Sequence, residues 1–265
     1  MKNNHNEIPV SIVITVKNEE KHIRELLESI KDQEGPFEVI VVDAESKDRT
    51  LEILNSYKNT LDIKIIIKKC TRGEGRNIGV NNSKYEYILF TDGDAILEKN
   101  WVSEMRKSFR DGYDFVAGKT ITIGKEKYSN FDRVEIFYKN IDVTYPSCNL
   151  AYKKKLFNDL GGFDERFITA EDIDLNYRAV DMGAKFHYNE NAIVYNRSRE
   201  DILSFIKQAF WNGYGRKQLT MKHGSLWKNY SINNLTSRRQ ISTYGIIRLI
   251  FALSGYLYAK ITYRL

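Results

Sequence analysis

Two aspartates separated by a single glycine follow an apolar segment, in the stretch Ile88–Asp94 (ILFTDGD). Two carboxylates with so little bulk between them can hold a hard divalent cation through oxygen atoms and leave other positions on the metal open to phosphate oxygens. The same three residues also make an ordinary turn. The segment is therefore a candidate cation site, with a plain turn as the alternative.

Polar and acidic residues also follow the two earlier apolar segments of the chain. They are Lys17, Asn18 and Glu19 after the first segment, and Asp43, Glu45 and Ser46 after the second. In an open parallel sheet, ligands bind outside the carboxyl ends of the strands. If these strands lie side by side, the carboxylates converge, and a cation or a hydrogen-bonding ligand must offset their repulsion. Ser46 is alternatively the cap of the next helix.

The carboxylates can meet at one edge only if the strands form a parallel sheet, with helices connecting them. The first half of the chain does alternate strand-like and helix-like segments. Val10–Val16 is a continuous β-branched run, as expected of a strand buried on both faces. Glu19–Asp32 then has Ile and Leu at helical spacing. The next expected elements are strand Glu38–Val42, helix Asp48–Tyr57, strand Ile63–Ile67, helix Gly75–Asn82 and strand Tyr87–Phe90. The pattern predicts an α/β fold with a mostly parallel central sheet flanked by helices.

The second half of the chain is less regular. Its expected strands are Asp114–Ile123, Lys185–Tyr188 and Ala192–Tyr195, and its expected helices are Asn130–Ile141, Lys153–Leu160, Glu171–Met182 and Asp201–Asn212. We find no internal repeat and no linker. We therefore expect one main domain, residues 1–220, and a helical C-terminal extension, residues 221–265.

The composition leaves several classes of binding partner open but favours one cellular location. A net charge of +6 and a pI near 9.0 suit a nucleic acid, an anionic membrane surface or a phosphate-bearing substrate, and many of these charges also fit a solvated helix face. Cys70 and Cys148 match neither a zinc spacing nor a disulfide framework. Val10–Val16 is too short for a signal peptide, so we expect a cytoplasmic protein.

The C-terminal stretch from Ile241 to Ala259 approaches the ~20 apolar residues of a spanning helix, but Arg248 and two glycines interrupt it. Basic residues flank it and tyrosines run along it: Arg238, Arg239, Lys260 and Arg264, with Tyr244, Tyr256, Tyr258 and Tyr263. This pattern suits a helix at the lipid headgroups, on the cytosolic face of the cell membrane. A helix that packs on its own domain or on a second chain fits equally well.

Five segments, taken together and in order, resemble the family 2 glycosyltransferases. They are VSIVITVKNEE, VIVVDAESKDRT, GEGRNIGVNNSKYEYILFTDGD, CNLAYKKKLFNDLGGFDERF and AEDIDLNYRAVDMGAK. The likeness runs from about Ile8 to Arg216. It implies a GT-A fold, with a donor-binding half at about 8–95 and an acceptor-binding half at about 96–220. It also implies an inverting hexosyltransferase of polysaccharide or glycolipid biosynthesis, which moves a sugar from a UDP- or GDP-sugar to a glycan or lipid-linked acceptor.

The resemblance also implies a set of donor-binding residues. These are Thr15, Val16, Asn18, Glu19, Asp43, Arg72, Arg76, Asn77, Asp92, Gly93 and Arg216. A carboxylate such as Asp43 accepts hydrogen bonds from the N–H edges of uracil or guanine, and arginines suit phosphate oxygens. For Arg76 a helix-surface charge is an equal alternative.

The metal and catalytic residues follow from the same likeness. Asp94, with Asp92, matches the DXD motif that holds Mn²⁺ or Mg²⁺, which stabilises the departing nucleoside diphosphate. Asp172, with Glu171 as second candidate, matches the ED motif whose carboxylate takes the proton from the acceptor hydroxyl. The two acids also suit the positive end of a helix without any catalysis.

One position departs from the family. Where many members have a metal-binding His, this chain has Asn196, whose carbonyl oxygen is a weaker candidate, and we expect the nearby His187 to be structural.

Two other functions remain as alternatives. A sugar-phosphate nucleotidyltransferase would need a Gly-rich basic loop after the first strand, where this chain has Lys17, Asn18, Glu19 and Glu20. A non-enzymatic module that binds nucleic acid or an anionic surface gives no reason for acids at every strand end. We therefore expect a nucleotide-sugar donor and no nucleic-acid partner. The C-terminal helix is a candidate for peripheral membrane contact, with packing on its own domain or on a second chain as the equal alternative.

Overall fold

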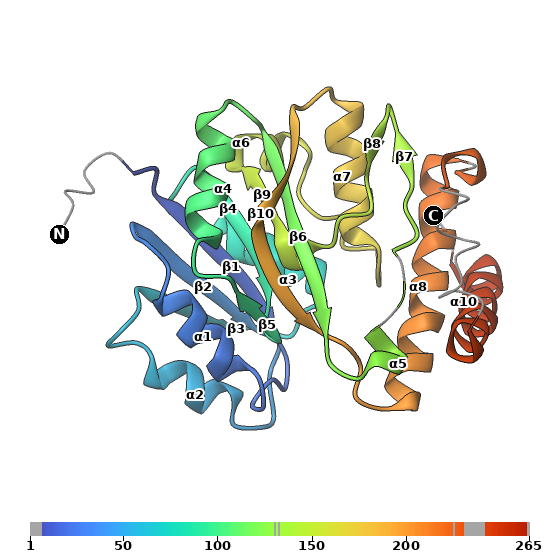
Figure 1. The fold of residues 1–265 in the computed structure, drawn as a ribbon, viewed down its shortest axis with the longest axis horizontal. Helices are drawn as coiled ribbons and strands as arrows, with labels where there is room; N and C mark the ends of the chain where they lie inside the picture. Colours follow the sequence, from blue (N-terminus) through green and yellow to red (C-terminus); the bar gives the residue numbers. More distant parts are fainter. Residues whose placement is uncertain (1–6, 130, 132, 225, 231–241, 264–265) are drawn as a thin grey trace. The chain divides into compact units, whose positions relative to one another are not determined.

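The apolar run at the start of the chain forms the central strand of an eight-stranded sheet (Figure 1). The computed structural model describes residues 7–129, 131, 133–224, 226–230 and 242–263. The chain divides into two units: residues 1–121, 146–163 and 182–196 form the first, and residues 122–145, 164–181 and 197–265 form the second.

The first unit begins with a regular alternation of strands and helices. Its elements are β1 (Val10–Val16), α1 (Ile23–Lys31), β2 (Phe37–Asp43), α2 (Thr50–Ser56), β3 (Ile63–Ile67), α3 (Arg72–Asn81), β4 (Tyr87–Asp92), β5 (Ala95–Leu97) and α4 (Trp101–Arg110). After these come β6 (Phe115–Ile123), the short helix η1 (Ser147–Asn149), β9 (Leu150–Lys153), α6 (Lys154–Asp159) and β10 (Phe186–Arg197). The predicted α/β fold with a central sheet is confirmed.

The strand order β3-β2-β1-β4-β9-β6-β10-β5 places a reversal at the centre of the sheet. The chain moves outward from β1 to β2 and β3, then returns through α3 to β4 on the other side of β1. All three pairings among these four strands are parallel. An α/β sheet binds ligands at the point where its strand order reverses. That point lies between the carboxyl ends of β1 and β4, where Thr15 pairs with Asp92.

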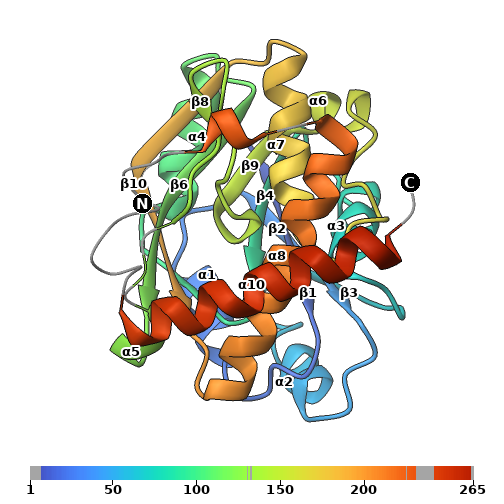
Figure 2. The ribbon, with the colours of Figure 1, turned by 90° about the vertical axis from the view of Figure 1, so that its right-hand side faces the viewer.

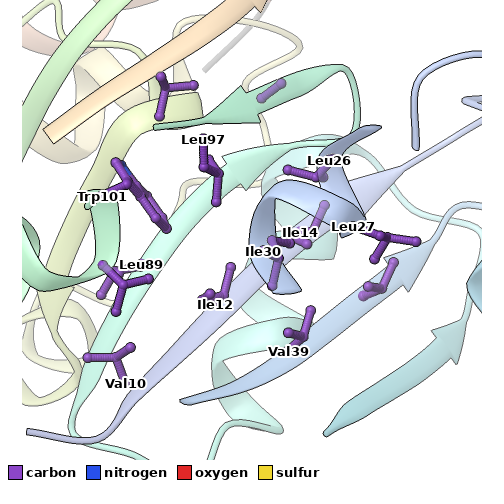
Figure 3. Packing of buried hydrophobic residues seen from close by; sticks show 14 of the residues in the cluster. Val10, Ile12, Ile14, Leu26, Leu27, Ile30, Val39, Leu89, Leu97 and Trp101 are labelled. Carbon is purple, nitrogen blue, oxygen red and sulfur yellow. The ribbon is translucent and has the colours of Figure 1, made fainter. Parts of the chain in front are cut away.

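Alternate residues of β1 serve the two faces of the sheet. Ile12 and Ile14 belong to the buried core that includes Leu26 and Ile30 of α1 (Figure 3). Val13 faces α3 on the opposite side, where Gly79 lies directly above it. Both faces are therefore covered, and this explains why the first strand is apolar at nearly every position.

Helix α3 approaches β1 unusually closely because it has glycines one turn apart. A Cβ on Gly75 would lie 2.7 Å from Cγ2 of Thr15, and one on Gly79 would clash with Cγ1 of Val13. With no side chains between them, the helix backbone rests on the strand. The next residue of the helix, Arg76, is thereby buried beside the end of β4.

The second unit contains longer helices and one hairpin. Its elements are α5 (Glu126–Ser129), β7 (Phe137–Tyr138), β8 (Ile141–Asp142), α7 (Glu171–Asp181), α8 (Ile202–His223), the short helix η2 (Trp227–Asn229) and α10 (Thr243–Thr262). Helix α10 crosses α8 (Figure 2). Within the described ranges, α10 is the one helix long and apolar enough to cross a membrane, and 17% of its most apolar 18-residue window is buried.

Several predicted elements differ from those observed. The helix expected over Asn130–Ile141 is wrong: this segment contains the β7–β8 hairpin, in which Lys139 and Asn140 have φ of 47° and 65°. Two consecutive left-handed residues make a tight hairpin turn. Strand β9 precedes the helix expected at Lys153, the two short strands expected after Lys185 are one strand, and α8 continues eleven residues beyond Asn212. Helix α4 was not predicted.

We predict that Gly79→Ala destabilises the protein by about 1 to 3 kcal/mol, because its Cβ cannot fit against Val13 in a packed core. Urea unfolding measures this loss. Val13→Ala removes the clashing methyl group, so the double variant should cost less than the sum of the single variants, by about 1 kcal/mol. Strict additivity would show that the glycine contact does not set the distance between helix and strand.

Candidate functional site

The loops that follow β1 and β2 are tied to each other by reciprocal hydrogen bonds. The backbone N of Asn18 donates to Ser46 Oγ at 2.9 Å, and the backbone N of Lys47 donates to Asn18 Oδ1 at 2.7 Å. Ser46 is not a helix cap, because Arg49 occupies the N-cap position of α2. Asn18 and Glu45 have φ of 56° and 59°, a strained conformation that clusters at functional sites. The edge of the sheet is therefore a rigid, preformed surface.

Asp43, at the end of β2, has a carboxylate of which one oxygen is hydrogen-bonded and the other is not. The residue is 1% exposed. Its Oδ1 accepts a hydrogen bond from the backbone N of Ser46 at 2.8 Å, while Oδ2 is buried with no hydrogen-bond partner. Buried polar atoms in proteins are almost always paired. Oδ2 therefore keeps an unused capacity to accept a hydrogen bond from an N–H or O–H group.

The end of β1 packs beneath the acidic turn. Thr15 lies under Gly75 of α3, and Val16 is only 3% exposed. A Cβ on Gly93 would lie 2.9 Å from Cγ1 of Val16 and 3.0 Å from Cγ of Glu19. Gly93 thus lets the Asp-Gly-Asp turn lie directly on the end of β1, which brings the predicted donor-binding residues Val16, Glu19 and Gly93 together.

Arg76 is a buried partner of the acidic turn. Its Nη2 donates to Asp92 Oδ1 at 2.8 Å, its side chain is 1% exposed, and the side chain of Asp92 is 25% exposed. The guanidinium carbon also lies 5.5 Å from the ring centroid of Phe163. The alternative of a helix-surface charge is wrong, because α3 buries this face against the sheet.

The other two predicted residues of α3 have different surroundings. Asn77 is bound to the backbone of Phe163: its Nδ2 donates to the carbonyl oxygen, and its Oδ1 accepts from the amide, both at 2.9 Å. The side chain of Asn77 therefore holds the Gly161–Phe163 turn in place. Arg72 is exposed at the first position of the helix, next to the N-cap Thr71, so it is open to solvent and to a ligand.

Asn196 lies next to the acidic turn in the sheet. Asp94 directly precedes β5, and Ala95 of β5 pairs with Asn196 of β10. The amide Nδ2 of Asn196 points to Cys148 Sγ at 3.7 Å, and its Oδ1 is buried with no hydrogen-bond partner. No cluster of three His, Cys, Asp or Glu side chains fit for a metal occurs in the described part of the chain. Two carboxylates with an amide oxygen nearby nevertheless suit a hard cation.

His187, in contrast, has structural partners. Its Nδ1 lies 3.0 Å from Ser108 Oγ, and its ring stacks on Tyr113.

The second unit contains the other predicted pair of acids, at the start of α7. Glu171 is 4% exposed, while Asp172 is partly exposed and its Oδ1 accepts from the backbone N of Ile173 at 2.9 Å. The preceding residue, Ala170, has a left-handed φ of 65°. Gly215 of α8 allows the chain before α7 to pass close by, since a Cβ there would lie 2.6 Å from the Thr169 carbonyl oxygen.

A buried carboxylate that the sequence reasoning missed fixes α7 to α8. Asp174 is fully buried and contacts Lys222 Nζ at 2.7 Å, Arg178 Nη2 at 2.7 Å and His223 Nε2 at 2.8 Å. Burial alone raises the pKa of Asp174, but the hydrogen bond from His223 and the charges of Arg178 and Lys222 outweigh it and lower the pKa. Its spacing of four residues from Arg178 was the available signal in the sequence.

Arg216 lies further along α8. Its Nη2 donates to the Val134 carbonyl at 2.9 Å, and its guanidinium carbon lies 5.5 Å from the ring centroid of Tyr230. Nη1 is buried and has no hydrogen-bond partner. This nitrogen therefore keeps a donor that an anionic group could use.

The family model and the similar proteins found by sequence comparison are all glycosyltransferases. Residues 11–166 match the model for "Glycosyl transferase family 2". The chain is 28% identical to glycosyltransferase AglE of Haloferax volcanii, over 80% of this chain and 74% of that protein. It is 25% identical to the pre-mycofactocin glycosyltransferase of Mycobacterium tuberculosis, over 81% of this chain, and spans about half (48%) of that relative.

Two solved structures have the same fold. The Staphylococcus aureus protein TarS, residues 1–349 in complex with UDP-GlcNAc, aligns with a TM-score of 0.63 and 21% identity over 95% of this chain and 81% of that one. The mannosyltransferase PcManGT of Pyrobaculum calidifontis, in complex with GDP-Man and Mn²⁺, aligns with a TM-score of 0.66 and 17% identity, over 97% and 76%. The fold is therefore the predicted GT-A fold.

We predict that Arg76→Ala destabilises the protein by about 2 to 3 kcal/mol, because it leaves the Asp92 carboxylate without its buried partner. Chemical denaturation measures the difference. Arg49→Ala is the matched control: Arg49 forms a comparable 2.9 Å pair with Glu52, but on an exposed surface, so its midpoint should not change. Equal effects from the two variants would contradict a special role of the buried pair.

Proposed function

The chain belongs to glycosyl transferase family 2 and is a glycosyltransferase, and we propose that it moves a sugar, with inversion, from a UDP- or GDP-sugar to a hydroxyl of a glycan or lipid-linked acceptor. One observation carries the proposal: the buried Asp43 Oδ2, which has no hydrogen-bond partner, ends β2 and is paired with Val16 of β1, while the acidic turn follows β4 on the other side of β1. The UDP-GlcNAc and GDP-Man of the two structural neighbours support either nucleotide.

In this proposal the nucleoside binds across the ends of β1 and β2. Asp43 Oδ2 accepts the ring N–H of uracil or guanine, because that hydrogen bond satisfies an otherwise orphaned buried acceptor. We assign Thr15, Val16, Asn18 and Glu19, at and after the end of β1, to the same donor-binding region. Arg72, exposed at the start of α3, offers hydrogen bonds to the diphosphate. In the second unit, Nη1 of Arg216 is the donor that we propose for an anionic group.

Asp94 is the principal ligand we propose for Mn²⁺ or Mg²⁺. Asp92 has one oxygen engaged by Arg76, which leaves its second oxygen for the cation or for the donor. Asn196 Oδ1 is the additional oxygen that the structure offers, in place of a histidine. When bound, the cation stabilises the negative charge that develops on the departing nucleoside diphosphate.

Asp172 is the general base in this proposal. It is more exposed than Glu171, which suits a group that must reach an acceptor hydroxyl. It lies in the first turn of α7, next to the positive end of the helix dipole. Asp172 removes the hydroxyl proton as that oxygen bonds to the anomeric carbon, and the bond from this carbon to the diphosphate breaks on the opposite side.

We predict that UDP or GDP raises the melting temperature and that Mn²⁺ increases the shift, because ligand at 100 times its Kd adds about 2.7 kcal/mol of stability. Asp94→Ala should remove the Mn²⁺-dependent part of the shift. Asp111→Ala, which removes an exposed carboxylate at the end of α4, is the control and should keep the full shift. An unchanged Mn²⁺ effect in Asp94→Ala would exclude this residue as the ligand.

We predict that Asp172→Asn leaves the nucleotide shift intact and slows the release of UDP from UDP-GlcNAc, or of GDP from GDP-mannose, by about 10²- to 10⁴-fold. The reason is that the base acts on the acceptor and not on the donor. Glu171→Gln, the neighbouring substitution of the same kind, should slow release less. If the order of the two effects is reversed, Glu171 is the base.

A further inference from the structure

The net positive charge of the protein comes from its C-terminal quarter. Residues 202–265 contain ten Lys or Arg and no Asp or Glu, whereas residues 1–201 contain 31 Lys or Arg against 35 Asp or Glu. The net charge of +6 is therefore the sum of a strongly basic segment and a slightly acidic remainder. Such asymmetry points to an anionic partner for that segment.

Helix α10, within this basic segment, has its apolar surface on the outside. The side chains that it buries are the smallest ones, at Gly245, Gly255 and Ala259. Six of its large apolar side chains are 49% to 79% exposed: Ile246, Leu249, Ile250, Leu253, Leu257 and Ile261. Their spacing places them along one side of the helix through its whole length. We call these six residues the outer stripe. A helix of a soluble domain normally has the opposite distribution.

The crossing with α8 explains why the large side chains face outward. A Cβ on Gly213 would collide with the Ala252 carbonyl oxygen, and a Cβ on Gly255 with the Phe210 carbonyl oxygen. The two helix backbones are thus in contact, and there is no room for Leu or Ile between them. The outer stripe is left as a continuous apolar surface, which marks an interaction site.

We propose that the outer stripe docks on an anionic lipid bilayer, with α10 lying in the headgroup layer parallel to the membrane plane. A transmembrane orientation fits less well, because one side of α10 packs along α8 and Arg248 lies in its middle. Tyrosines suit the headgroup layer, and Tyr256 has Lys217 5.3 Å from its ring centroid.

Charge distinguishes this occupant from a second copy of the chain. A symmetric dimer through the outer stripe would bring together two copies of α10, each with the basic residues Arg248 and Lys260 and with no acidic residue. An anionic leaflet instead attracts each lysine or arginine near its surface. The docking itself does not depend on which sugar is moved. Docking would bring a glycosyltransferase to a lipid-linked acceptor in the same surface. That second inference does rest on the proposed function.

Vesicle flotation of the full chain tests the docking. The protein should float with phosphatidylcholine vesicles that contain about 30% phosphatidylglycerol at low salt, and much less with pure phosphatidylcholine or at high salt. Leu253→Glu, in the middle of the outer stripe, should lower the bound fraction about tenfold. Met182→Glu removes an apolar side chain of similar exposure outside the basic segment, so it is the matched control and should bind like the unmodified chain.

Equal flotation of Leu253→Glu and the unmodified chain would overturn the proposal. A dimer in sedimentation velocity that Leu253→Glu dissociates, with no vesicle binding, would also overturn it and assign the stripe to a second copy. The nucleotide-dependent thermal shift of Leu253→Glu should be normal. If nucleotide does not raise the melting temperature of the unmodified chain, the proposed function is refuted, and the docking result still stands.

Discussion

The candidate site depends on one close approach, the contact between α3 and the central strand β1. Because Gly75 and Gly79 carry no side chains, the helix rests on the strand, and Arg76 reaches the acidic turn from inside the protein. The Arg76–Asp92 pair then fixes the first carboxylate of that turn and balances part of its charge. Bulk at the two glycines would move the helix, the arginine and the turn together.

The candidate site is held rigid by hydrogen bonds between its loops, in addition to the packing of side chains. The loops after β1 and β2 exchange hydrogen bonds, and Asn18 and Glu45 are held in a left-handed conformation. Asn77 fixes the Gly161–Phe163 turn in a similar way. A surface that is already ordered loses little conformational entropy when a ligand binds, so unpaired groups such as Asp43 Oδ2 can contribute fully to affinity.

The sequence predicted the parallel strands because their apolar runs and the acids after them carry local signals. It did not predict the β7–β8 hairpin, since FYKNI also fits a helix and only the two left-handed residues in the turn decide. Arg76 was ambiguous because spacing alone does not reveal which face two glycines bury. Asp174 and Asn196 were undervalued, because their importance comes from partners distant in sequence, on α8 and next to β5. Of the expected basic flank of the C-terminal helix, Arg238, Arg239 and Arg264 lie outside the described residues.

The central claim is that a nucleotide binds where the strand order reverses, with its base on Asp43 and its diphosphate by Asp94. A crystal structure of the full chain with UDP or GDP and Mn²⁺ tests this claim most directly. Our account predicts a ring N–H of the base within hydrogen-bond distance of Asp43 Oδ2, and a metal ion between Asp94 and the phosphates. A nucleotide bound elsewhere, with Asp43 Oδ2 still unpaired, would contradict it.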